Sequence, residues 1–137
     1  MQKIYHQDHL LGMIVREEEF LTGYNFVSPQ DWLLQIGFNN YQGGFNCQPH
    51  EHLQRPANVM AEASKNVIEV LHVLKGRCLL QLYWQDKPVE AVELKTGDSA
   101  VLVAGGHGIK MLEPTKIFEV KQGPYVSRDL DKRCFNE

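Results

Sequence analysis

The sequence is poor in the features that mark several large classes of protein. It has only three cysteines, Cys47, Cys78 and Cys134, with no CxxC spacing, which argues against a disulfide framework and for a reducing compartment. Its lysines and arginines are scattered, and the net charge of −3 gives no general attraction to nucleic acid or to an anionic membrane. No apolar run approaches a membrane span, and residues 1–8 lack the apolar core of a signal peptide. We therefore expect a cytoplasmic protein.

Long helical patterns are also missing, and short apolar runs separated by turn residues take their place. Only Ser28-Pro29-Gln30-Asp31 has the signature of a helix start, and we expect at most one helical turn there. The charged tail from Ser127 onward is expected to be loosely held. Regularly spaced strands with almost no helix predict an all-β, antiparallel sandwich or barrel in one domain, residues 1–137. The expected strands are residues 11–15, 32–38, 45–52, 67–74, 78–84, 89–94, 99–103, 109–112 and 116–120.

Two histidines one residue apart, His50 and His52, are the strongest sign of a functional site. Residues i and i+2 of a strand point to the same face, so both imidazoles could bind one metal ion. Glu69 opens an apolar strand and needs a partner if it faces the core, and a cation would serve. His107 follows two glycines that allow a tight turn. Cys47 has the opposite strand parity to His50, so we do not count it as a ligand.

These residues resemble the two motifs of the cupin superfamily. The first motif is His-x-His, then Glu, six residues and Gly, and this chain has His50-Glu51-His52, Glu69 and Gly76; the second is matched by Gly97-Asp98 and His107. The resemblance covers about residues 24–127 and is closest to small bacterial cupins. It implies a double-stranded β-helix, the cupin jelly roll, with one divalent transition metal (Fe, Mn, Ni or Zn) held by His50, His52, Glu69 and His107. The long segment 53–68 is interpreted as an extra hairpin or a lid.

Other candidates for the site have competing interpretations. Glu119 and Lys121 share one face of a strand, either inside the cavity, with Glu119 catalytic and Lys121 binding substrate, or as an ion pair on the surface. Arg55 could hold an anionic substrate, or it could be a solvated loop residue. Gln35 and Tyr125 are weaker candidates for substrate binding.

Three functions are compatible with this sequence. The first is a metal-dependent enzyme acting on a small polar molecule, either by isomerising or epimerising a sugar derivative or by Fe(II)-dependent oxygenation. The second is a binding or sensing module without turnover, and the third is a jelly roll whose metal only stabilises it. We expect a small-molecule ligand and a homodimer, with no nucleic-acid or membrane partner.

Overall fold

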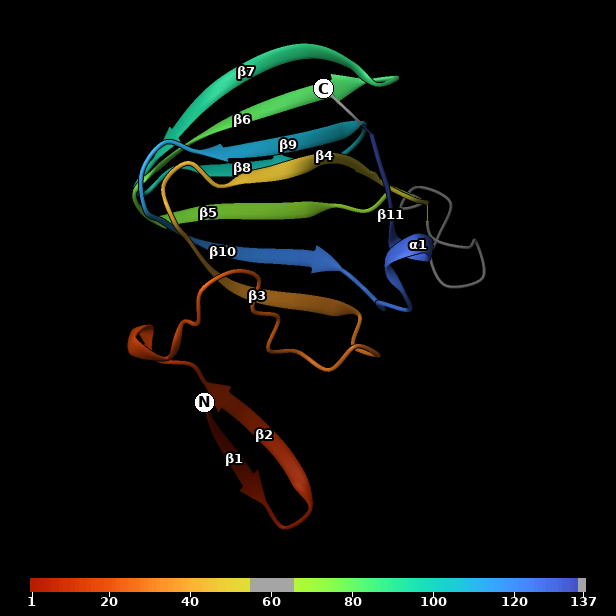
Figure 1. Ribbon diagram of the computed structural model, residues 1–137. Coiled ribbons are helices and arrows are strands. Elements are labelled where there is room, and N and C mark those ends of the chain that lie inside the picture. The colour runs from red at the N-terminus through yellow and green to blue at the C-terminus, as the bar shows by residue number, and fades with distance from the viewer. Residues whose placement is uncertain (55–65, 136–137) are drawn as a thin grey trace.

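The computed structural model describes residues 1–54 and 66–135, and their regular secondary structure is almost entirely β-strand (Figure 1). In the described part of the chain, no helix is long and apolar enough to cross a membrane. The strands are β1 (Gln2–His6), β2 (His9–Ile14), β3 (Leu34–Tyr41), β4 (Asn46–His52), β5 (Glu69–Lys75), β6 (Arg77–Trp84), β7 (Lys87–Lys95), β8 (Ser99–Leu102), β9 (Gly106–Met111), β10 (Thr115–Gln122) and β11 (Lys132–Cys134). A 3-10 turn, η1 (Glu17–Glu19), and one short helix, α1 (Arg128–Asp131), complete the elements.

Two antiparallel sheets form the body of the molecule. One has the strand order β3-β10-β5-β8 and the other the order β11-β4-β9-β6-β7. The core contains buried side chains from both sheets, so it lies between them, as is usual for a sandwich. The predicted all-β, antiparallel class is therefore confirmed. The core residues are Tyr41, Cys47, Leu71, Val73, Cys78, Leu80, Leu94, Ile109, Met111 and Ile117.

The β-prone runs form strands close to the expected positions, and the differences occur at their ends. β3 continues to Tyr41, into the connection expected between the strands 32–38 and 45–52, because it pairs with β10 along its whole length. The expected helix start at Ser28 is instead a turn in which the Trp32 N–H donates to the Pro29 carbonyl (3.2 Å). The Ser28 hydroxyl caps no helix because it accepts a hydrogen bond from the Ile36 N–H (2.9 Å).

The turn expected around His107 is shorter than predicted. Gly105 has a φ of +74°, a left-handed conformation that glycine adopts without strain, and β9 begins at the next residue. His107 is therefore the second residue of a central strand, where pairing with two neighbours fixes its backbone.

Both ends of the chain contain more regular structure than expected. β1 and β2 pair with each other in a separate two-stranded sheet that projects away from the body (Figure 1). The tail, expected to be loose, forms α1 and β11, and β11 pairs with β4 beside the two histidines. That expectation is wrong because Asp131, which is 1% exposed, makes buried polar contacts that hold the tail in place. The expected lid or hairpin at 53–68 falls mostly outside the described residues.

Candidate metal centre

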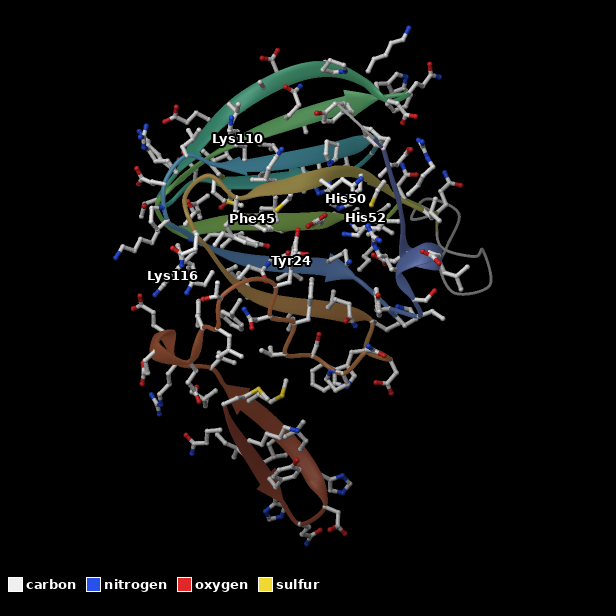
Figure 2. All side chains as sticks on the ribbon, in the orientation of Figure 1. Tyr24, Phe45, His50, His52, Lys110 and Lys116 are labelled. Carbon is white, nitrogen blue, oxygen red and sulfur yellow. The ribbon has the colours of Figure 1, made fainter. Side chains whose placement is uncertain are left out.

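Three histidines from two neighbouring strands meet at one point. His50 and His52 lie on β4, and His107 of β9 is the direct cross-strand partner of His50. One ring nitrogen from each lies within 4.8 Å of the others, a spacing that could hold a metal ion. The centroids of the His50 and His52 rings are 5.1 Å apart, and those of His50 and His107 are 4.5 Å apart. Figure 2 shows the two labelled histidines of β4 close together.

Glu69 is buried against two of these rings. Its Oε2 atom lies 3.0 Å from His52 Nε2 and 3.4 Å from His107 Nε2. Glu69 is 4% exposed, so it faces inward, which is the case in which the carboxylate needs a partner. A carboxylate with three imidazoles is a donor set that suits a divalent transition metal. The four residues implied by the cupin resemblance therefore lie in one cluster.

Hydrogen bonds and charge prepare the histidines for a cation. The His50 Nδ1–H donates to the Gln48 carbonyl (2.9 Å), which leaves the lone pair on Nε2. Burial lowers the pKa of His50 to about 3 and also lowers the pKa of His107, so both rings are neutral at pH 7, as metal ligation requires. Burial also disfavours His52 protonation, but the carboxylates of Asp131 and Glu69 outweigh it and raise the His52 pKa.

The Glu69 carboxylate keeps its negative charge in this position. Burial favours the protonated acid, but the nearby His107 and His52 rings outweigh burial and lower the Glu69 pKa below its usual range. An ionised buried carboxylate facing three imidazoles is an environment that favours a cation.

A β-bulge in β4 brings Cys47 to the same side as the histidines. Cys47 pairs with Ile109 and His50 with His107, so three steps along β4 match two steps along β9. The extra residue reverses the side-chain alternation. The prediction that Cys47 faces the opposite side from His50 was therefore wrong, because Cys47 lines the cavity. Cys47 is nevertheless not part of the group of three histidines. Burial raises the pKa of the Cys47 thiol, which favours the uncharged form that binds metal poorly.

Glu119 and Lys121 both point from β10 into the interior and are 7% and 6% exposed, so they are not a surface ion pair. The Asn39 amide donates to Glu119 Oε2 (2.7 Å), and Glu119 shares a hydrogen bond with Glu69. Burial and the negative charge of Glu69 raise the pKa of Glu119 to about 8. A proton can therefore reside on this carboxyl near neutral pH.

Gln35 and Tyr125 also line the cavity, but their side chains make different contacts. The Gln35 amide nitrogen donates to the carbonyls of Pro29 (3.1 Å) and Trp32 (3.1 Å), so that half of the side chain holds the 29–32 turn. The ring centroid of Tyr125 lies 5.9 Å from Lys121 Nζ. Arg55 lies outside the described residues.

Asp131 is the site residue that sequence reasoning missed. Its Oδ2 atom lies 3.3 Å from His52 Nδ1 and 2.9 Å from Lys121 Nζ. It thus joins a candidate metal ligand to a buried lysine. Its sequence context, an acid in the run Arg128-Asp-Leu-Asp-Lys-Arg, is typical of a solvated tail, so no local pattern points to it.

These groups line a cavity of about 430 Å³, a size that accepts a small organic molecule. The histidines and Glu69 lie on its wall together with the β10 pair and Asp131. Positive side chains and aromatic rings complete it. The lining residues are Tyr24, Phe26, Ser28, Gln30, Gln35, Tyr41, Cys47, His50, His52, Glu69, His107, Ile109, Glu119, Lys121, Tyr125, Arg128, Asp131 and Lys132.

Known structures share this fold at low sequence identity. A cupin superfamily protein from Desulfitobacterium hafniense matches with a TM-score of 0.55 at 15% identity, over 80% of this chain and 83% of that chain. A protein from Bacillus halodurans matches with a TM-score of 0.55 at 20% identity, over 69% of this chain and 65% of that one. The structural resemblance confirms the predicted cupin fold. No family model and no curated protein sequence matches the chain.

Two enzymes are also similar in structure. Salicylate 1,2-dioxygenase from Pseudoaminobacter salicylatoxidans matches with a TM-score of 0.51 at 14% identity, over 67% of this chain. The match spans only 22% of the dioxygenase. A structure from DMSP lyases matches with a TM-score of 0.51 at 19% identity, over 75% of this chain and 44% of that one. At these identities the likeness concerns the fold.

Proposed function

We propose that this protein binds one divalent transition metal through His50, His52, Glu69 and His107 and acts as a metal-dependent enzyme on a small polar molecule. The observation that carries the proposal is the convergence of three histidine nitrogens, all within 4.8 Å, on the wall of a cavity of about 430 Å³. The dioxygenase and the lyase among the structural neighbours support an enzyme.

A bound metal would supply Lewis acidity and a place to hold a substrate oxygen. The residues of the chain supply the rest. Glu119, held by Asn39 and raised in pKa, is positioned to give or take a proton beside the ligands. Lys121 and Tyr125 on the same wall are positioned to orient the substrate, whereas Gln35 acts mainly by holding the cavity rim.

The cavity favours an enzyme or a binding module over a metal that only stabilises the fold. A structural site is closed by its protein ligands, whereas this donor set borders a space lined by Glu119 and Lys121. Enzyme and binding module differ by turnover. Fe(II)-loaded protein that consumes dioxygen would be an oxygenase, and activity that also occurs with Mn, Ni or Zn without dioxygen would be an isomerase.

Metal analysis of the purified protein, prepared without chelator, tests the proposal. We expect close to one equivalent of transition metal and its loss in His50→Ala. His72→Ala is the matched control, because His72 lies on β5 with its ring bonded to Ser99 (2.9 Å) and lines no part of the cavity. Less than about a tenth of an equivalent, unchanged by His50→Ala, would contradict the proposal.

We also propose that the protein is a cytoplasmic homodimer. Exposed apolar side chains on the β1–β2 hairpin, including Tyr5 and Leu11, and on the edge strand β8, at Val101, are compatible with a second subunit. Light scattering of the eluted protein would distinguish a mass near 31 kDa, twice the 15.7 kDa of the chain, from that of a monomer.

A further inference from the structure

Two lysines flank the candidate metal centre, one from each sheet. Lys132 of β11 is the direct cross-strand partner of His52, and Lys121 of β10 is the partner of Glu69. Side chains of directly paired residues lie on the same face of a sheet. Both ammonium groups are therefore directed to the cavity that holds the histidines, and both lysines line it.

Lys121 is held in a fixed position. A buried ammonium group is costly unless it is paired, and Asp131 Oδ2 provides the partner at 2.9 Å. The ring centroids of Phe26 and Tyr125 lie 5.3 and 5.9 Å from its Nζ atom, close enough for cation–π attraction. Its charge is thus presented to the cavity from a rigid setting.

The ammonium group of Lys132 has fewer partners than that of Lys121. Its Nζ atom lies 6.0 Å from the ring centroid of Tyr24, and among the described residues no carboxylate lies within ion-pair distance of it. Its neighbour Arg133, on the outer face of the same strand, is paired with Glu51 and Asp86. The acids of the cavity already have partners: Asp131 binds Lys121, and Glu119 accepts from Asn39. Of the two lysines that line the cavity, Lys132 is therefore the one without a carboxylate partner among the described residues. Arg128 also lines the cavity, and its guanidinium donates to Cys134 Sγ (3.3 Å).

We propose that Lys132, supported by Lys121, forms an anion-binding subsite beside the metal centre, and that the substrate is a small organic anion, a carboxylate or a phosphate ester. This inference rests on the proposed function for its location in the same cavity. The apolar wall of Tyr24, Phe26 and Ile109 favours an apolar body on that anion. Lysine, a point charge, accepts either kind of anion.

Binding of matched probes tests the subsite. Benzoate and phenyl phosphate carry the two anions on the same apolar ring, and benzamide is an uncharged counterpart. We would measure their dissociation constants by calorimetry on metal-loaded and metal-free full-length protein. We expect both anions, or one of them, to bind at least about tenfold more tightly than benzamide, because a hydrogen bond to a charged group is at stake.

Variants assign the effect to the lysine. Lys132→Gln should weaken anion binding at least about tenfold without changing metal content, and Lys132→Arg should retain it. Lys110→Gln is the matched control, because Lys110 is exposed on β9 and does not line the cavity (Figure 2). If benzoate and phenyl phosphate bind with different affinities, the tighter-binding probe identifies the kind of anion that the subsite prefers.

The outcomes separate this inference from the proposed function. If metal is bound but benzamide binds as well as the anions, or if no probe binds, the anion subsite is wrong and the metal centre stands. If no metal is bound, the metal centre is wrong, and the loss of anion binding in metal-free Lys132→Gln still decides the subsite. Anion binding that Lys132→Gln leaves unchanged would also overturn it.

Discussion

The two ends of the chain are both short β-structures, but only one of them is built into the site. The β1–β2 hairpin pairs with itself and stands away from the sheets, with Leu11 67% exposed (Figure 1). The α1–β11 segment pairs with β4 and places Asp131, 1% exposed, against His52 and Lys121. Secondary structure alone therefore does not identify the end of the chain that forms part of the candidate site. The buried polar contacts of Asp131 identify it.

The largest effect should follow loss of Asp131. Asp131→Ala leaves the buried Lys121 ammonium without its carboxylate and releases His52 Nδ1, which should cost about 3–5 kcal/mol in free energy of unfolding. Metal affinity should fall about 10- to 100-fold, because the ring of His52 loses a group that orients it. Urea denaturation and a metal titration would measure both.

Asp129 provides the control within the same helix. It is exposed, so Asp129→Ala should change the free energy of unfolding by no more than about 0.5 kcal/mol and leave metal affinity unchanged. Equal effects of the two substitutions would mean that the C-terminal segment is not specifically part of the site.

A smaller effect should distinguish Gly106 of β9, which lies against the C-terminal segment, from Gly12 of the N-terminal hairpin. A Cβ on Gly106 would lie 2.7 Å from the ring of Phe135 and 3.0 Å from the His50 carbonyl oxygen, so Gly106→Ala should push the C-terminal segment away. We expect a loss of about 1–3 kcal/mol in free energy of unfolding. A Cβ on Gly12 of β2 meets nothing within 4 Å, so Gly12→Ala should be neutral. Thermal unfolding of both variants would measure these effects. If Gly106→Ala is no less stable than Gly12→Ala, the comparison between the two ends does not hold.

The smallest effect is expected from removal of the hairpin. Deleting residues 1–14 removes β1, which is exposed, β2, which is exposed or half-buried, and the contact of the Met1 amino group with Glu19. The free energy of unfolding of the remaining body should change by less than about 1 kcal/mol, since a lone two-stranded hairpin contributes little. Metal content should not change. A truncated protein that loses metal or fails to fold would show that this end is coupled to the site after all.

Much of the fold was predictable because its strands carry their own signals. The runs that became β4, β5 and β6 are β-prone and bounded by turn residues, and the spacing of His50 and His52 places both rings on one face. Glu69 was identifiable as an acid in an apolar strand. These are local properties, which a sequence displays directly.

Other parts of the site depend on contacts between distant segments. Asp131 is important because β11 pairs with β4, about 80 positions earlier in the chain, and a charged tail carries no mark of such pairing. Glu119 and Lys121 were ambiguous because strand alternation fixes a shared face without saying which face is buried. Cys47 was misassigned because a bulge is a property of two paired strands.

The bulge in β4 makes the length of this strand as significant as its composition. Pro49 lies within it, in a central strand where a residue without an N–H is tolerated only at such an irregularity. Removing one residue at 48 or 49 would restore regular alternation, and either Cys47 or the pair His50 and His52 would then turn to the outside. If the histidines turned outward, every residue type needed for the site would still be present, yet the donor set could not assemble. A one-residue deletion here thus changes the face of the sheet to which the side chains point, and a comparison of residue types alone would not detect this change.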